Sequence, residues 1–224
     1  YAVLTSENFG LSVPTFYIDL SSFDRASGLC TQPVDMAYYT TDPVNYEARF
    51  ELNYIIDQRK GSVDVIREVL TSFNGFLVMS NGKLKLLVER DTGIIDGYFD
   101  EDNIIDGSFS REQLPRDGKF NFLVVDGCDE RNDYRKVPVP IIIDFDRDIT
   151  GEVRSTSIDA VGVTRPRQAA IVGMTNALGS VLRDYACSWK AGIEGYRYEV
   201  GDVLGITEES SNWTDHKLQL GPGF

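Results

Sequence analysis

Three aspartates at alternate positions, Asp144, Asp146 and Asp148, are the residues of this sequence most suggestive of chemistry. Carboxylates spaced in this way can converge as hard oxygen ligands on Ca²⁺. An EF-hand loop starting at Asp144 would also need glycine at its sixth position and glutamate at its twelfth, where the sequence has Ile149 and Ser155. At the end of a strand the same carboxylates would share an exposed face without a metal. Both interpretations stay open, and no metal ligand is assigned.

Other acidic neighbours and the only histidine are residue types that catalytic sites use. Carboxylates at 100–102 and 208–209 are of the type used in glycoside cleavage. Adjacent side chains of an extended segment point in opposite directions, and 35 acidic residues produce such neighbours by chance, so solvated loops are predicted. A nucleophilic serine or cysteine usually needs a histidine base, but His216 has no Gly-x-Ser-x-Gly motif to accompany it. His216 is predicted at the surface or a strand edge, and no catalytic residue is assigned.

The three cysteines, Cys30, Cys128 and Cys187, are an odd number at wide spacing. This pattern argues against a disulfide framework and a Cys/His metal site, and it suits assembly in a reducing cytoplasm. The sequence also has no Gly-x-x-x-x-Gly-Lys phosphate loop. We therefore expect no enzyme activity and no cofactor.

The clearest structural element of the sequence is a β-hairpin within residues 72–91. Apolar residues alternate on both sides of 80–83, and the Asn81-Gly82 pair favours a type I′ turn because both central residues need positive φ. A helix is predicted before it, with Ser62 as N-cap and Gly75 as its end, and a strand is predicted over 48–55. Strand, helix and hairpin would share one apolar face, as an α+β unit over 46–93. Residues 1–45 would form a lead with a short helix near 21–26, stopped by Gly28, and a connector.

The remainder, 94–224, is predicted to be mostly β. Residues 94–99 and 104–109 form a near repeat that suggests two similar strands, and further strands are predicted at 120–125 and 137–143. Prolines place the last of these at a sheet edge. One long helix is predicted over about 166–186, starting near Thr164 and Pro166. Closing strands at 187–191, 196–198 and 201–207 predict a barrel or sandwich that the helix plugs or flanks.

Charge and hydropathy limit the possible partners. The net charge is −13 and the pI is about 4.5. Such a field repels phosphate backbones, so nucleic acid and anionic membrane surfaces are unexpected partners. No stretch approaches the ~20 apolar residues of a membrane span. Because the sequence begins with Tyr1 rather than methionine, we expect it to be a piece of a longer chain.

Read in order, several segments resemble the tail tip attachment or baseplate hub family of long-tailed bacteriophages. They are residues 4–11 and 18–23 with Cys30; 48–53, the helix from Ser62, 75–77 and 81–84; 105–110 and 120–121; 158–159, 163–165 and 168–169; and 199–204 with 212–214. Each segment is short, and their order and spacing carry the resemblance. Members of this family are usually longer than this chain and have receptor-binding modules downstream.

The resemblance implies a structural virion protein with barrel domains. It would be a hub, commonly a homotrimer, that closes the tip of the tail tube and is assembled in the cytoplasm of the bacterial host. Its partners would be copies of itself, the tape measure protein and distal tail proteins, and the family has no catalytic residues to assign. Two alternatives stay open: a tail-associated cell-wall hydrolase, and a carbohydrate-binding module that uses aromatic side chains.

Overall fold

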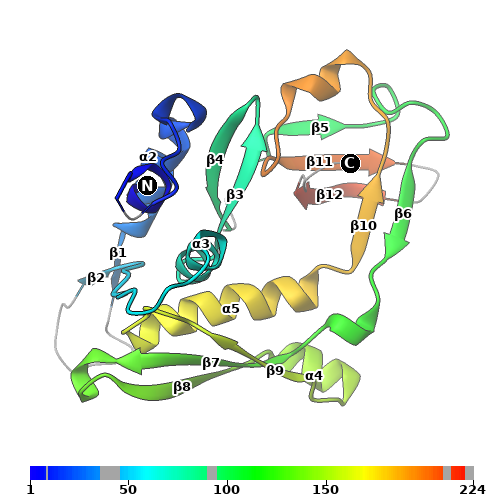
Figure 1. Cartoon of the computed structure of the whole chain (residues 1–224). Coiled ribbons are helices and arrows are strands. Elements are labelled where there is room, and N and C mark those ends of the chain that lie inside the picture. Colours follow the sequence, from blue (N-terminus) through cyan, green and yellow to red (C-terminus); the bar gives the residue numbers. More distant parts are fainter. Residues whose placement is uncertain (9, 36–45, 90–94, 209–212, 220–224) are drawn as a thin grey trace. The chain divides into compact units, whose positions relative to one another are not determined.

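The computed structural model describes residues 1–8, 10–35, 46–89, 95–208 and 213–219 (Figure 1). Contacts group the chain into two compact units. Unit 1 consists of Tyr1–Glu89 and Asp117–Leu182, and unit 2 consists of Arg90–Arg116 and Arg183–Phe224. The units interleave along the chain, whereas the domains predicted from the sequence, 1–45, 46–93 and 94–224, follow one another.

Unit 1 begins with short helices. These are α1 (Ala2–Thr5), η1 (Thr15–Tyr17) and α2 (Leu20–Cys30). The side chain of Asp19 caps α2 by accepting from the backbone N–H of Ser21 at 3.1 Å. The prediction that Gly28 stops this helix is wrong, because α2 continues to Cys30. Helix α2 packs on the hairpin with Ala26 and Leu29 buried, which outweighs the weak helix propensity of one glycine.

The strand predicted over 48–55 is also wrong. Two short antiparallel strands, β1 (Pro33–Asp35) and β2 (Tyr46–Ala48), pair with each other, and residues 50–57 are irregular. The backbone N–H of Glu51 donates to the side chain of Gln168, and that of Asn53 donates to the carbonyl of Gly162. A side chain and a loop therefore satisfy donors that a neighbouring strand was expected to satisfy.

The predicted helix and hairpin are confirmed. Helix α3 spans Ser62–Thr71, with Gly61 rather than Ser62 at the N-cap position. Strands β3 (Gly75–Ser80) and β4 (Lys83–Val88) pair antiparallel, and φ is 50° at Asn81 and 73° at Gly82, as a type I′ turn requires. Helix α3 contacts β3 and helix α2 contacts β4, so two helices rather than one cover the hairpin.

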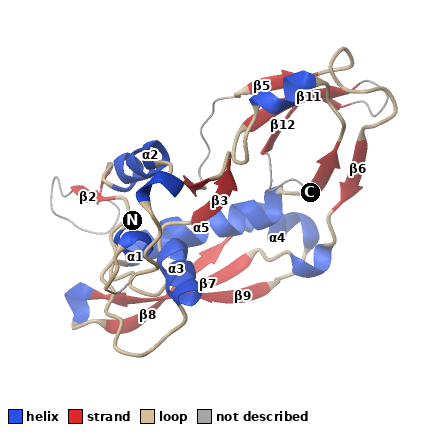
Figure 2. Cartoon of the chain, turned by 45° about the horizontal axis from the view of Figure 1, so that its top comes forward, coloured by secondary structure: helices blue, strands red, loops and turns tan. Residues whose placement is uncertain are grey.

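A three-stranded sheet and the long helix make the second part of unit 1 (Figures 1 and 2). The sheet order is β8 (Arg135–Ile142), β7 (Phe122–Asp129), β9 (Ser155–Asp159). Strand β8 is an outer strand, which confirms the edge position predicted from its prolines. Helix α5 (Pro166–Leu182) packs on β7 and β8 and ends at Leu182 rather than near 186. The core between helix and sheet contains Leu123, Val125, Ile141, Val163, Ala169 and Ala177.

Unit 2 contains two small sheets around its own core. Strand β5 (Gly97–Phe99) lies parallel to β11 (Val203–Glu208), which pairs antiparallel with β12 (Trp213–Gln219). Strand β6 (Ser110–Gln113) pairs with β10 (Tyr185–Ser188). The 3-10 turn η4 (Ile193–Arg197) replaces the strand predicted at 196–198. The second half of the near repeat is not a strand, since Ile104 makes only a single bridge with Ala191.

The core of unit 2 joins residues next to both sheets. Phe99 packs at 5.5 Å from the Trp189 ring and 5.4 Å from the Tyr198 ring, with Ile104, Leu204 and Ile206 buried beside them. The fold is thus mixed α+β. Over the described residues the strands form sheets of two or three, and no closed barrel is present among them.

Candidate functional site

The alternating aspartates lie on a helix and not at the end of a strand, which corrects the expectation from the sequence. Helix α4 spans Asp144–Thr150. Positions four apart share a helix face and positions two apart do not, so Asp146 points away from Asp144 and Asp148. Asp144 pairs with Arg147 at 2.8 Å, whereas Asp146 pairs with Arg154 at 2.7 Å. The three carboxylates therefore do not converge.

Asp146 belongs to a polar cluster that closes the end of the sheet. The amide nitrogen of Asn121 donates to Asp146 and to the carbonyl of Glu152, both at 2.8 Å. The amide oxygen of Asn121 accepts from the backbone N–H of Arg154 at 2.9 Å. Asn121 is 1% exposed, so its polar atoms need these partners. The Asn121 amide and the Asp146 carboxylate are thus used in joining helix α4 to the sheet, and the Nε atom of Arg154 is the one buried side-chain nitrogen of this cluster without a partner among the described residues.

The other candidates do not come together either. Asp100 accepts from the backbone N–H of Asp102 in the turn after β5. Glu208 ends β11, and Glu209 lies outside the described residues. The backbone of His216 pairs with Ile206 in the outer strand β12. Within the described ranges, no group of three or more His, Cys, Asp or Glu side chains is placed to hold a metal ion.

The cysteines are free thiols, as the sequence predicts. Burial raises the pKa of the Cys30 thiol and of the Cys187 thiol, with a smaller opposing effect from Arg49 and Arg111 respectively. Both thiols are therefore more fully protonated at neutral pH than a free cysteine, which makes them poor nucleophiles.

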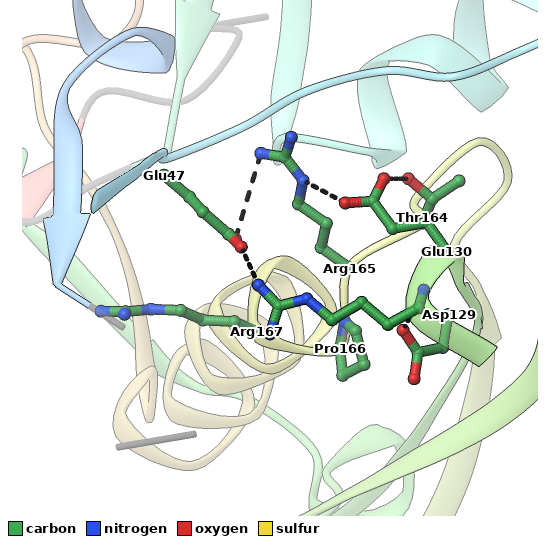
Figure 3. A pocket seen from close by; sticks show the side chains of 8 residues that line it. Glu47, Asp129, Glu130, Thr164, Arg165, Pro166 and Arg167 are labelled. Atoms are coloured by element: carbon green, nitrogen blue, oxygen red, sulfur yellow. Dashed lines mark hydrogen bonds and ion pairs between the residues drawn. The ribbon is translucent and has the colours of Figure 1, made fainter. Parts of the chain in front are cut away.

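A polar pocket of about 260 Å³ lies at the start of helix α5 in unit 1 (Figure 3). Its lining comes from three parts of the chain that are distant in sequence: β2, the end of β7 with the turn η3 (Glu130–Asn132), and residues 164–167 at the start of α5. The lining residues are Glu47, Asp129, Glu130, Arg131, Thr164, Arg165, Pro166 and Arg167. The pocket is therefore built from three acids and three arginines, with one hydroxyl.

Local structure explains how these side chains are held. The Asp129 side chain caps η3 by accepting from the backbone N–H of Arg131 at 3.0 Å. Pro166 is the first residue of α5, where its missing N–H costs nothing. The backbone N–H of Glu130 donates to the carbonyl of Thr164 at 3.0 Å, which ties the turn to the beginning of the helix.

Arg165 is the centre of the ion pairs in this pocket. Its guanidinium lies 2.5 Å from a carboxylate oxygen of Glu51, 3.3 Å from Glu130 and 4.0 Å from Glu47. Figure 3 shows the Arg165 side chain between Glu47 and Glu130. With only 19% of its side chain exposed, Arg165 needs these carboxylates as partners.

The remaining groups extend this network. Arg131 pairs with Glu47 at 2.9 Å, so Glu47 serves two arginines. The hydroxyl of Thr164 donates to Glu130 at 3.2 Å and accepts from the side chain of Asn53 at 2.9 Å. Each acid that lines the pocket thus accepts a hydrogen bond or an ion pair from an arginine, a hydroxyl or a backbone N–H. Two of the three arginines, Arg131 and Arg165, are paired with carboxylates.

Arg167 is the exception. Its Nη1 atom is buried and has no hydrogen-bond partner among the residues that the structure describes. No dashed line reaches Arg167 in Figure 3. Figure 3 also shows that the Arg167 side chain extends away from Arg165, Glu130 and Asp129, so its guanidinium is not part of the ion-pair network. The residues that line the pocket include no serine, cysteine or histidine that could form a nucleophile–base pair.

Sequence reasoning did not identify this pocket. Thr164 and Pro166 indicate only the start of a helix, and Glu47 and Glu130 lie far from them in the sequence. The available signal was the Arg165-Pro166-Arg167 run, which puts two cations at the positive end of a predicted helix, where acids are favoured.

The chain is similar to known proteins in both sequence and fold. A family model described as a putative phage tail protein matches residues 63–219. No curated protein gives a significant match. A solved structure titled as the virion of a native gene transfer agent particle is similar, with a TM-score of 0.54 and 12% identity, over 69% of this chain and 35% of that one. The crystal structure of the tail protein from Neisseria meningitidis MC58 is also similar, with a TM-score of 0.53 and 10% identity. The similarity covers 73% of this chain and 50% of that protein.

These two likenesses concern the fold alone, because identity is low. The chain spans about a third and a half of the length of the two proteins. The family match, in contrast, covers most of the chain and runs through segments of both compact units.

Proposed function

This chain belongs to the family of putative phage tail proteins, and from that premise we propose that it is a hub or tip attachment component of a tail. The role of a tail protein is structural. The finer assignment to the tip rests on the ordered segments that resemble tip attachment and hub proteins, among them the helix from Ser62, residues 81–84 and residues 199–204.

The observation that carries this proposal is the extent of the family match, 63–219, which includes the hairpin, the β7–β9 sheet, helix α5 and the described strands of unit 2. Such a match describes an arrangement of elements rather than one site. Because the described residues hold no paired catalytic groups, we propose that the chain is not an enzyme.

We propose further that unit 2 is the barrel-like part of the hub. Its two sheets share one core, since Phe99, Leu204 and Ile206 of one sheet pack in the same cluster as Cys187 and Trp189. Two sheets around a common core can close into a barrel when further strands or a neighbouring chain fill the gaps. The parent protein is the natural source of such strands if it has the length of its structural neighbours.

The partners follow from this assignment. We propose a homotrimer in the assembled tail, with contacts to tape measure and distal tail proteins, and assembly in the bacterial cytoplasm. The net charge of −13 opposes binding to nucleic acid. In the described part of the chain no helix has the length and apolar character needed to cross a bilayer.

The proposal is tested on particles. An antibody raised against the chain should label one end of the tails in particles purified from the source strain, and deletion of the gene should give particles without that tip. Absence of the protein from such particles would contradict the assignment. Release of sugars or peptides from peptidoglycan by the purified chain would favour a hydrolase, and selective binding on a glycan array would favour a carbohydrate-binding module.

A further inference from the structure

We propose that copies of this chain join by strand addition, with the outer edge of β9 in one copy pairing against the outer edge of β3 in the next. Both strands belong to unit 1 (Figure 1). Because the two edges differ, the contact is head-to-tail and can close a ring. The inference rests on the proposed homotrimer for the size of that ring, and its test in solution needs no tail.

The hairpin leaves the backbone of β3 open on one side. The backbone N–H of Glu89 donates to the carbonyl of Asn74 in line with the hairpin register. Because positions alternate along a strand, residues 76, 78 and 80 then face β4, and Leu77 and Met79 face outward. Among the described residues, the outward N–H and C=O groups of Leu77 and Met79 have no hydrogen-bond partner, and the Met79 side chain is 66% exposed.

The opposite edge of the hairpin is closed by the chain itself. The backbone N–H of Asp19 donates to the carbonyl of Leu84 at 2.9 Å, and the Ser22 hydroxyl accepts from the backbone N–H of Leu86 at 3.0 Å. Natural proteins protect a strand edge with proline, charge, a bulge or such a cover. Strand β3 has no proline, no charged residue and no break in its register, so its outer edge is suited to receive a further strand.

The three-stranded sheet blocks one of its edges with prolines. The backbone N–H of Ile143 donates to the carbonyl of Asn121, which makes Ile142, Pro140 and Pro138 the positions of β8 that face outward. Proline has no N–H, so two of the outward donors are missing from this edge. Strand β8 is therefore protected against the addition of another strand.

The other outer strand of this sheet, β9, has no such protection. The backbone N–H of Ala160 donates to the carbonyl of Asp126, so the alternate positions Ser155, Ser157 and Asp159 face away from β7. In the part of the chain that the structure describes, their backbone groups have no hydrogen-bond partner. The strand contains no proline and no lysine. Unit 1 thus offers two different open edges.

Charge favours pairing of these two edges with each other. Residues 72–88 include Lys83 and Lys85 and no acid, although the net charge of the chain is −13. Strand β9 ends at Asp159, and the arginine just before the strand, Arg154, is already paired with Asp146 at 2.7 Å. Pairing of β3 with a second β3 would bring lysines together, and pairing of β9 with a second β9 would bring aspartates together. Only the unlike pairing brings opposite charges together.

Proline substitutions can block each edge without breaking a hydrogen bond inside the chain. Met79→Pro and Ser157→Pro each remove an outward N–H, and the residue before each proline lies in a strand, as proline favours. Met79→Thr and Ser157→Thr are the matched controls, because threonine keeps the N–H and suits a strand.

Self-association of the isolated full chain is measured by sedimentation up to millimolar concentration. We expect trimers for the wild type and both threonine variants, and roughly a tenfold or greater loss of affinity for each proline variant. An equimolar mixture of the two proline variants should give dimers, because one partner keeps an open β9 and the other an open β3. Dimers in that mixture also show that both variants are folded.

Hydrogen exchange locates the contact on β3. In the monomer, the outward amides of Leu77 and Met79 should exchange faster than those of Val78 and Ser80, which donate to β4. Association should protect the outward pair as well. Outward amides that exchange equally fast in the monomer and in the trimer would reject β3 as the edge used.

The remaining outcomes decide against the proposal or separate it from the proposed function. A monomeric wild type, or equal association of Met79→Pro and Met79→Thr, overturns it, and self-association of Ser157→Pro alone would indicate a β3–β3 contact instead. If trimers form through these edges but the protein is absent from particles, the proposed function fails and the interface stands. If the protein lies at the tail tip but the isolated chain is monomeric, the interface fails and the function stands.

Discussion

The side-chain nitrogen of Gln168 donates a hydrogen bond of 2.9 Å to the backbone carbonyl of Ser72, which joins helix α5 to the end of α3. The amide oxygen of the same side chain accepts from the backbone N–H of Glu51 at 3.0 Å. Gln168 is 3% exposed, so one buried amide holds three segments of unit 1 together.

Gln168→Met should destabilise the chain, because it preserves the side-chain volume and leaves both backbone groups without a partner. We expect a loss of about 1–3 kcal/mol in the free energy of unfolding, measured with urea. Arg67→Ala is the control, since the Arg67–Asp64 pair is exposed and should contribute less than about 0.5 kcal/mol. Equal effects of the two substitutions would show that the buried amide has no special role.

Gly173→Ala should also destabilise the chain. A Cβ at this position in α5 would lie 2.6 Å from Val125 and 2.8 Å from Ile141, in the core between helix and sheet. Overpacking of this kind costs about 1–3 kcal/mol. The opposite sign is expected for Gly28→Ala in α2, where nothing lies within 4 Å and alanine should stabilise the helix by about 0.5–1 kcal/mol. Thermal unfolding of both variants checks the pair.

Substitutions at the two central residues of the hairpin turn should have different effects on the free energy of unfolding. Gly82 has φ of 73°, and an alanine there should cost about 1–2 kcal/mol because a Cβ disfavours left-handed backbone. Asn81→Gly should be nearly neutral, since glycine adopts positive φ without strain. If chemical denaturation showed Gly82→Ala to be neutral, the type I′ geometry would be in doubt.

The Tyr54–Glu68–Lys60 cluster should make stability depend on pH. A hydrogen bond from the Tyr54 hydroxyl, and then one from Lys60 at 2.9 Å, lower the pKa of Glu68. A lowered carboxyl pKa stabilises the folded state above the unfolded value of about 4.3, and this contribution is lost as the pH falls through the folded pKa. Glu68→Gln should therefore destabilise the chain at neutral pH, with a difference from wild type that shrinks in acid. A difference that does not vary between pH 7 and pH 3 would contradict this.

At alkaline pH the same cluster should make the chain less stable as the pH rises, because the pKa of Tyr54 is raised in the folded state. The Glu68 hydrogen bond is the main cause that raises the pKa of the Tyr54 hydroxyl. Its contribution is present below the ordinary tyrosine pKa of about 10 and is lost as the pH rises through the raised value. Ultraviolet titration of the wild-type chain and Glu68→Gln should show one tyrosine moving to lower pKa in the variant.

Local signals in the sequence predicted the local elements well. Asn81-Gly82 specifies its turn through backbone sterics, and the apolar spacing before Leu182 specifies α5. Predictions failed where distant contacts decide. The alternation of Phe50, Leu52 and Tyr54 suggested a strand, but Gln168 and Gly162 take the hydrogen bonds of that segment. The near repeat failed at Ile104, which has a single bridging partner instead of a neighbouring strand.

The pocket could not be predicted, for a related reason. Its acids and arginines are ordinary surface residues when viewed one segment at a time. Only the fold brings Glu47 to Arg165 and Arg131, across more than a third of the chain. The aspartates of α4 show the opposite case. Their alternate spacing suggested a shared site, but residues two apart lie on different faces of the helix that this segment forms.

The interleaving of the two units has a consequence for biosynthesis. Strand β5 leaves the ribosome long before β11, and the Val203 backbone reaches the Asp96 side chain across 107 residues. All of the Asp117–Leu182 segment is translated in between. All residues of unit 1 are therefore synthesised before β11, the strand that pairs with β5, so unit 1 can fold first. An arrest of translation before Val203 should yield a folded unit 1 attached to an unpaired β5.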